Sequence, residues 1–194
     1  MAGNGSVRGK IACLLASGFE DSELEIPLER LQAAGYEVEV IGAEAGDKLE
    51  GMRGEVTVSA HLGIADADVA SYEGLLIPGG HSPDVLRADQ RFVDFVEAFD
   101  ATGRPLAAVC HGPQLLLSAE LVRGRTLTAW STVQGDLRQA GAEVVDEPVV
   151  VDENWITSRK PEDLELFSAK LIETLAELED RGRWAGAVPD PQLA

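Results

Sequence analysis

The sequence predicts an α/β protein in which an open, mostly parallel β-sheet carries helices on both faces. Short apolar runs alternate with longer amphipathic segments along the chain, and this alternation is typical of parallel sheets. A chain of 194 residues also suits one domain and is long enough to bury a sizeable core. The sequence shows no internal repeat, linker or second domain.

In the first half of the chain, short apolar runs are expected to form strands. They lie at residues 10–16, 36–42, 54–60 and 72–80, the third in a hairpin with 47–51 and the fourth ending in the turn Gly79–Gly80. A helix is expected at 22–35, where Leu24, Leu28 and Leu31 share one face, Pro27 is tolerated early and Gly35 ends the helix. A second helix is expected at 89–103, with Phe92, Phe95, Val96 and Phe99 on one face.

The second half continues the same alternation. Strands are expected at 104–110 and 126–130, and two more around a turn within 142–159. Helices are expected at 112–121, 132–141 and 161–180. We therefore place one domain at 10–180, with a disordered start at 1–9 and a loose tail at 181–194.

Composition bounds the classes of partner. The formal net charge is −18, and so acidic a surface repels phosphate backbones and anionic lipid, which argues against nucleic-acid and membrane partners. Two explanations fit this charge: the acidic residues keep the protein soluble, or the host organism is adapted to salt. Residues 1–10 lack the apolar core of a signal peptide, so we expect a cytoplasmic protein whose Cys13 and Cys110 are reduced thiols.

Cys110 stands at the carboxyl end of an expected strand, immediately before an expected helix. Ligands of open α/β sheets bind at this edge. The run "AVCHG" has the spacing of a strand–nucleophile–helix turn, in which the small residues Ala108 and Gly112 allow close approach and the nucleophile is strained and exposed. The following helix N-terminus, with Pro113 in its first turn, favours a thiolate. Cys13, inside a strand, is expected to be inert.

Together, four stretches resemble the PfpI intracellular protease family. They are "FEDSEL" (19–24), "LIPGGHSPDVLR" (76–87), "AVCHGPQLLLSAELVRGRTLT" (108–128) and "VVVDENWITSRKPEDL" (149–164). That family lies within the superfamily of the parkinsonism-associated deglycase and the class I glutamine amidotransferases. The resemblance runs in order from about residue 9 to 178 and implies a flavodoxin-like three-layer sandwich.

The resemblance also implies roles for individual residues. Cys110 would be the nucleophile with His111 beside it, Glu23 would point at the sulfur, and the N–H groups of Gly80 and His111 would bind an oxyanion. In PfpI-like proteins the acid that completes a Cys-His-acid arrangement comes from a neighbouring subunit, just after the Gly-Gly turn, and here that position is Asp84. Trp130 stands where some relatives carry a tyrosine. PfpI-like relatives suggest dimers, or hexamers built from dimers.

Further polar residues have an ordinary structural role as an alternative to a role in the site. Glu20 and Asp21 fit the acids that favour a helix N-terminus, although Glu20 is also a candidate for the pocket. His61 is expected to be a satisfied surface histidine, whereas Gly79, His81 and Trp130 are candidates for the pocket wall. Arg159 is either structural or part of the site. We expect no metal and no nucleotide, because neither ligand spacing nor a phosphate-binding loop is present.

Two functions remain open. One is a cysteine-dependent hydrolase or lyase, a peptidase, deglycase or glyoxalase, acting on a peptide, a glycated molecule or a small aldehyde. The other is a redox-sensing or chaperone-like stress protein that uses oxidation of Cys110. Because no histidine follows His111, an α/β-hydrolase and a glutamine amidotransferase are set aside.

Overall fold

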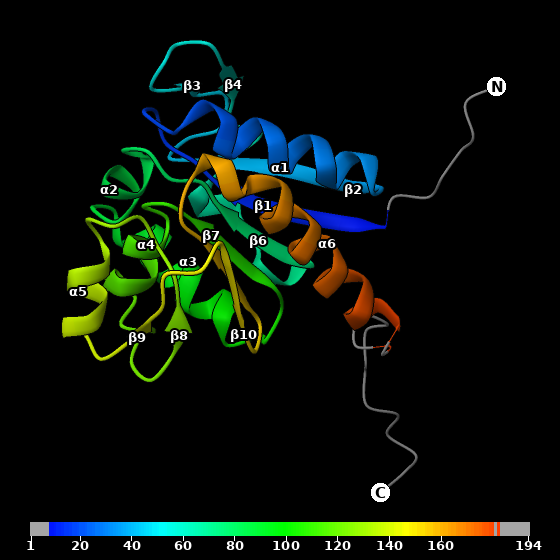
Figure 1. Ribbon diagram of the computed structural model, residues 1–194. Coiled ribbons are helices and arrows are strands. Elements are labelled where there is room, and N and C mark those ends of the chain that lie inside the picture. Colours follow the sequence, from blue (N-terminus) through cyan, green and yellow to red (C-terminus); the bar gives the residue numbers. More distant parts are fainter. Residues whose placement is uncertain (1–7, 181, 183–194) are drawn as a thin grey trace, which may run out of the picture.

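A seven-stranded sheet forms the centre of the molecule, with strand order β10-β11-β7-β6-β1-β2-β5 (Figure 1). The computed structural model describes residues 8–180 and 182. The strands of this sheet are β1 (Gly9–Leu14), β2 (Tyr36–Gly42), β5 (Leu62–Gly63), β6 (Gly74–Ile77), β7 (Leu106–Val109), β10 (Val149–Asp152) and β11 (Trp155–Ser158). All neighbours pair in parallel except β10 and β11. The order β2-β1-β6-β7-β11 is the flavodoxin-like one.

Helices cover both faces of the sheet. On one face α1 (Asp21–Ala33) packs beside α6 (Leu164–Asp180), as Figure 1 shows. The other face carries α2 (Ser82–Leu86), α3 (Gln90–Asp100) and α4 (Pro113–Ser118), with α5 (Gln134–Gln139) further out. The predicted fold class, a mostly parallel sheet between helical layers, is therefore confirmed.

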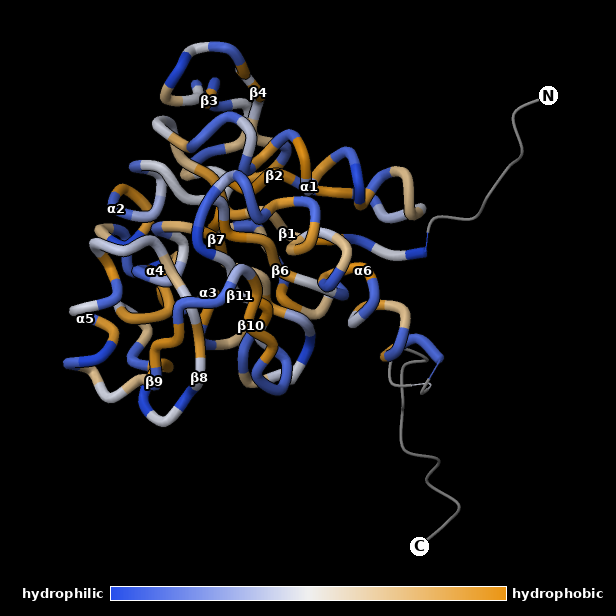
Figure 2. Tube along the Cα trace, viewed as in Figure 1, coloured by the Kyte–Doolittle hydropathy of each residue, from blue (hydrophilic) through white to orange (hydrophobic). Residues whose placement is uncertain are grey.

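The sheet is apolar on both faces, as the orange colour of its central strands shows (Figure 2). Along β1, Ile11 and Cys13 belong to the core under α1 and α6, whereas Ala12 and Leu14 belong to the core on the other face. Side chains alternate between faces along a strand, so a strand covered twice must be apolar at every position. This double burial explains the continuous apolar runs in the sequence.

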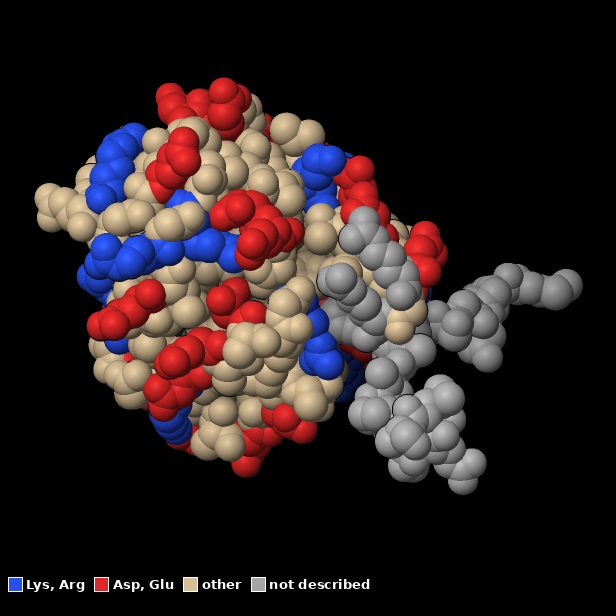
Figure 3. Space-filling view, turned by 90° about the horizontal axis from the view of Figure 1, so that it is seen from below, with Lys and Arg blue, Asp and Glu red and all other residues tan. Residues whose placement is uncertain are grey.

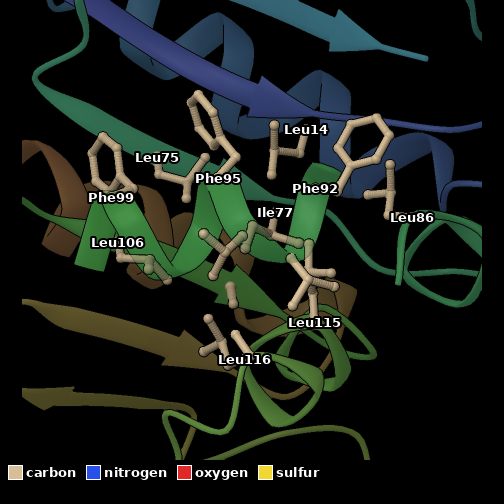
Figure 4. Close-up of a cluster of buried hydrophobic side chains, with 14 of the residues drawn as sticks. Leu14, Leu75, Ile77, Leu86, Phe92, Phe95, Phe99, Leu106, Leu115 and Leu116 are labelled. Atoms are coloured by element: carbon tan, nitrogen blue, oxygen red, sulfur yellow. The ribbon is translucent and has the colours of Figure 1, made fainter. Parts of the chain in front are cut away.

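The core between the sheet and α3 is built on phenylalanines. Phe92, Phe95 and Phe99 of α3 lie in one buried cluster with Leu14 and Leu75 of the sheet (Figure 4). The Phe95 and Phe99 rings stack with centroids 6.4 Å apart. The expected apolar face of this helix is thus the face that packs on the sheet.

Short elements depart from the sequence-based expectation. The hairpin β3 (Lys48–Glu50) and β4 (Thr57–Ser59) forms as predicted. The strand expected at 126–130 is shorter, because β8 spans only Thr126–Leu127, where it pairs with β9 (Glu143–Val144). Elements α2 and β5, and the 3-10 helices η1 (Ile64–Asp66), η2 (Val69–Ser71) and η3 (Pro161–Asp163), were not predicted, because they are too short to show a period.

The predicted ends of the chain lie mostly outside the described residues. The residues outside the description are 1–7, 181 and 183–194, and they fall within the expected disordered start (1–9) and loose tail (181–194). Strand β1 begins at Gly9, one position before the expected start of the domain. Within residues 8–180, no helix is long and apolar enough to cross a membrane.

Charged side chains on the surface form mixed patches. In the view from below, acidic side chains gather in several groups with basic side chains between them (Figure 3). Many of the cations are paired with an acid, as in Arg30–Glu165 at 2.8 Å and Arg159–Asp163 at 2.9 Å. The acidic excess expected from the sequence is therefore interspersed with local ion pairs.

The α3 core gives a test of the fold. Phe99 is 0% exposed, so Phe99→Ala removes a buried ring and should lower the free energy of unfolding by about 3–5 kcal/mol. Leu166→Ala, at a leucine that is 51% exposed, is the control and should change it by less than about 0.5 kcal/mol. Urea denaturation measures both, and equal losses would contradict the packing described.

Candidate active site

A pocket of about 310 Å³ lies at the carboxyl ends of the central strands. The strand order reverses between β1 and β6, which is where ligands bind in open α/β sheets. The pocket wall contains every predicted site residue except Gly79, together with two residues, Met52 and Pro161, that were not predicted. The lining residues are Glu20, Glu23, Met52, Gly80, His81, Asp84, Cys110, His111, Trp130 and Pro161.

Cys110 occupies the turn between β7 and α4 with a positive φ of 60°. This conformation is uncommon for a non-glycine residue and marks the strained turn expected from the sequence. The Cys110 N–H donates to Ser158 O at 3.0 Å, and its carbonyl accepts from the Trp130 N–H at 2.9 Å. The expectation of an exposed side chain is wrong, because Cys110 is only 7% exposed and lies at the floor of the pocket.

Glycines allow the backbones to approach this turn. A Cβ on Gly112 would lie 2.5 Å from Ile77 O, and a Cβ on Gly79 would lie 2.8 Å from Cys110 Cβ. Gly80 has a φ of +71°, and a Cβ there would lie 2.5 Å from the carbonyl oxygen of Gly18. The Gly-Gly turn after β6 can therefore sit against the cysteine only because it carries no side chains.

Glu23 lies in the first turn of α1 and is 0% exposed. Its Oε2 accepts a hydrogen bond from the Gly79 N–H at 2.8 Å, and its Oε1 has no nitrogen or oxygen partner among the described residues. The carboxyl also makes a hydrogen bond with the Cys110 side chain. Burial raises the pKa of Glu23 to about 7, although the Gly79 and Cys110 hydrogen bonds oppose this rise.

The Cys110 thiol is subject to opposing influences. Burial, the negative charge of an ionised Glu23 and the hydrogen bond with Glu23 raise the pKa of Cys110, whereas the backbone N–H groups of Gly80 and His111 lower it. The net direction is upward while Glu23 is ionised. The expectation that the helix N-terminus favours a thiolate is therefore incomplete, since two N–H groups do so but burial and the carboxylate outweigh them.

His111 follows the cysteine and contacts it through its ring. Its Nδ1 lies 3.3 Å from Cys110 Sγ, and its Nε2 lies 3.4 Å from Thr132 Oγ1. Burial lowers the pKa of His111, while the charge of Asp84 raises it and that of His81 lowers it. The imidazole is thus held in its neutral form near neutral pH and can accept a proton.

Asp84 lies on α2, at the wall of the pocket of its own chain. It forms an ion pair with Arg87 at 2.7 Å. Among the hydrogen bonds of the described residues there is none between Asp84 and His111. Asp84 therefore acts on the imidazole through its charge within one chain, and its role across a subunit interface stays a prediction.

The acids before Glu23 point in other directions. Glu20 lines the pocket and pairs with Arg53 at 3.1 Å. Asp21 is 2% exposed and accepts hydrogen bonds from the backbone N–H groups of Arg53, Glu55 and Val56. The interpretation of Asp21 as a simple helix-terminus acid is therefore incomplete, because its carboxylate binds a distant segment.

Of the remaining polar and aromatic candidates, two line the pocket and two do not. His81 and Trp130 line the pocket, and the Trp130 ring centroid lies 6.3 Å from that of His111. His61 lies elsewhere, with its Nδ1 accepting the Val40 N–H at 2.8 Å. Arg159 pairs with Asp163 and Asp146 and does not line the pocket.

Cys13 lies in the core and not in the pocket. Its side chain is 0% exposed, and burial raises the pKa of its thiol to about 12. Within residues 8–180 and 182, no group of three or more histidine, cysteine and carboxylate side chains could hold a metal ion.

Three residues of the site carry no signal in the sequence. Met52 and Pro161 line the pocket, and Thr132 contacts His111. Met52 comes from the segment between β3 and β4, and Pro161 begins η3. These positions carry no local motif, and only the packing of distant segments brings them to the cysteine.

Comparison with known proteins places the chain in a family. The model of the DJ-1/PfpI family matches residues 9–174. A protein of Escherichia coli named protein/nucleic acid deglycase 2 is 46% identical over 167 residues, covering 86% of this chain and 97% of that protein. An uncharacterised protein of Staphylococcus aureus is 46% identical over 168 residues, covering 86% of this chain and 98% of that protein.

Solved structures agree with these sequence relatives. A protein of Anabaena variabilis with DJ-1/ThiJ/PfpI-like and ferritin-like domains superposes with a TM-score of 0.84 at 38% identity, over 94% of this chain and 50% of that one. This chain thus spans about half of that two-domain protein. DJ-1beta of Drosophila melanogaster superposes with a TM-score of 0.79 at 28% identity, over 91% of this chain and 95% of that one. The flavodoxin-like sandwich is confirmed, and the chain belongs to the DJ-1/PfpI family.

Proposed function

We propose that the protein is a cysteine-dependent enzyme whose Cys110 thiolate attacks the carbonyl carbon of a small aldehyde or of a glycated molecule. The observation that carries this proposal is the surroundings of the sulfur. Two backbone N–H groups, from Gly80 and His111, point at it, with the Glu23 carboxyl and the His111 imidazole beside it. This is the arrangement that attack by a nucleophile and stabilisation of an oxyanion require.

In the proposed first step, the thiol proton passes to His111 Nδ1, 3.3 Å from Sγ. A bond then forms between the sulfur and the carbonyl carbon, and the electron pair of the C=O π bond moves onto the oxygen. Because the Gly80 and His111 N–H groups are fixed in the backbone, they can stabilise this oxyanion without reorganising. Transfer of the proton from His111 to the oxygen completes a neutral hemithioacetal when the substrate is an aldehyde.

Glu23 shares a proton with Cys110 in this proposal. A buried carboxyl with a pKa near 7 is partly protonated at neutral pH and can donate its O–H to the sulfur. Since the two groups interact strongly, the first proton to leave belongs to the pair and not to either residue alone. A protonated Glu23 also removes the charge that otherwise opposes a thiolate.

Pocket size favours small substrates within this class. A cavity of about 310 Å³ is at the lower end of the range of small-molecule sites. The Escherichia coli relative is named a deglycase, which supports deglycase or glyoxalase chemistry over cleavage of folded proteins. Turnover of methylglyoxal or of glycated amino acids that is lost in Cys110→Ser distinguishes catalysis from a cysteine that only undergoes oxidation.

The first prediction concerns the identity of the reactive thiol. Limiting iodoacetamide at neutral pH should label Cys110 at least about tenfold faster than Cys13, because Cys110 lines the pocket and Cys13 is buried. Peptide mapping by mass spectrometry measures the ratio.

Turnover of methylglyoxal or of glycated amino acids should disappear in Cys110→Ser and persist in Cys13→Ser. Preferred labelling of Cys13, or turnover without Cys110, would contradict the proposal.

The second prediction concerns Glu23. A hydrogen bond to a charged group contributes about 1.5–3 kcal/mol, so loss of the donor in Glu23→Ala should raise the Cys110 pKa by about 1 to 2. Glu23→Gln keeps a donor of nearly the same size and should stay close to the wild type. Ultraviolet absorbance of the thiolate against pH measures both. A lower pKa in Glu23→Ala would show that Glu23 is ionised and opposes the thiolate.

The third prediction concerns Asp84 and assembly into a dimer or hexamer, which we propose from the family resemblance. Asp84→Asn removes a charge that raises the His111 pKa, so this pKa should fall, as an NMR titration of the imidazole would measure. Asp68→Asn, which changes an exposed capping carboxylate, is the control. Light scattering over a dilution series measures the oligomeric state at each concentration used for the titration. If the His111 pKa changes when the oligomer dissociates, the charge that acts on His111 comes from a neighbouring subunit. If the His111 pKa is unchanged in Asp84→Asn, Asp84 has no part in the mechanism.

A further inference from the structure

Residues 50–56 form a segment that is fastened along the loop between β1 and α1, and we call this segment the strap. Gly18 N–H donates to Glu50 O at 2.7 Å, and Met52 N–H donates to Phe19 O at 2.7 Å. Glu50 N–H donates to Ser17 Oγ at 3.1 Å. The strap connects the hairpin strands β3 and β4, which are not part of the central sheet. Its position over the site therefore depends on these local hydrogen bonds.

The carboxylate of Asp21 accepts three of the hydrogen bonds that hold the strap. Asp21 Oδ2 accepts from the Arg53 N–H at 2.9 Å, and Oδ1 accepts from the N–H groups of Glu55 and Val56 at 3.1 and 2.8 Å. Burial disfavours its charge, but these backbone hydrogen bonds lower the pKa of Asp21 overall. A Cβ at Gly51 would overlap the carboxylate, so glycine is needed for this approach.

The strap carries one side chain to the mouth of the pocket. Met52 lines the same cavity as Cys110 but is 48% exposed, whereas Cys110 is 7% exposed. The methionine therefore borders the opening and the cysteine lies at the floor. The next residue, Arg53, pairs with Glu20, a second lining residue, at 3.1 Å. The strap thus supplies one edge of the entrance, and Asp21 holds that edge in place.

We propose that Met52 is a specificity-determining residue that limits the size of the electrophile reaching Cys110, and that Asp21 is a positioning residue that acts through the strap. The exclusion follows from position, because the unbranched Met52 side chain lines the cavity at its exposed edge, on the side from which a larger substrate would approach Cys110. This inference rests on the proposed function for its substrate class, small carbonyl compounds. Access to the sulfur can be measured without turnover.

Alkylation of native Cys110 by two reagents tests the role of Met52. Rates are measured with iodoacetamide and with a fluorescein-bearing maleimide, and labelling is assigned to Cys110 by peptide mapping. Met52→Ala should raise the maleimide rate relative to the iodoacetamide rate by about tenfold, the order of discrimination that a few missing side-chain atoms produce. Met52→Leu, of similar volume, should keep the wild-type ratio. Leu166→Ala, at an equally exposed apolar residue of α6, is the control. A ratio in Met52→Ala equal to that in Leu166→Ala would overturn the proposal.

The role of Asp21 is tested with the same ratio of maleimide to iodoacetamide rates. This ratio would stay unchanged if Asp21 only stabilised the fold. Asp21→Asn weakens the backbone hydrogen bonds and should shift the ratio in the direction of Met52→Ala, whereas Asp68→Asn should not. Combining Asp21→Asn with Met52→Ala should add little, since both open the same edge. Gly51→Ala displaces the same carboxylate and serves as a second variant if Asp21→Asn fails to fold. A wild-type ratio in a folded variant would remove Asp21 from the role.

Failure of the inference differs from failure of the proposed function. A protein that turns over no carbonyl compound refutes the function, but its alkylation ratio still reports access to the sulfur. Where turnover is present, kcat/KM for a glycated peptide should rise relative to that for methylglyoxal in Met52→Ala. A fall in both by the same factor would contradict size selection and leave the cysteine chemistry intact.

Discussion

The close approach of two backbones around Cys110 is the constraint on which the rest of the site depends. Gly112 allows the turn after β7 to lie against the carbonyl of Ile77, and Gly79 allows the turn after β6 to lie against the cysteine itself. The positive φ of Cys110 is then held from both sides, by hydrogen bonds to Ser158 and from Trp130. Such strain persists only where the surroundings over-determine it. The fixed donors at the sulfur follow from this packing, since they are main-chain N–H groups of the same two turns.

Fixed main-chain donors leave the control of charge to a few side chains. Peptide N–H groups do not titrate, so the pH response of the sulfur comes from Glu23 and His111. Burial of Glu23 raises its pKa to about 7, and an ionised Glu23 raises the pKa of Cys110. The two acids therefore compete for one negative charge in a space that stabilises a single one. A buried carboxyl beside a nucleophile is therefore compatible with ionisation of the sulfur only when the carboxyl holds the proton.

Periodicity and local motif predicted most of the frame, because they reflect forces that act along the chain. The apolar run of β7 follows from burial on both faces, and the phenylalanines of α3 follow from packing on one. Cys110 was placed by its strand-turn-helix context. The buried state of its sulfur, the direction of its pKa and the contribution of Met52 were not predicted, because each depends on packing between distant segments. Asp21 shows the reason, since its partners lie more than thirty residues away and are backbone groups that leave no mark in the sequence.

The register of α1 connects chemistry at the sulfur to the shape of the entrance. Three acids at the start of this helix serve three purposes: Glu20 pairs with Arg53 at the mouth, Asp21 holds the strap, and Glu23 faces the sulfur. Successive helical residues point about 100° apart, so neighbouring acids must face different surroundings. A rotation of α1 would therefore move the proton donor and the edge of the entrance together. This coupling gives a physical reason for acids so close in sequence to lie in such different environments, one ionised by backbone donors and another kept near its neutral form by burial.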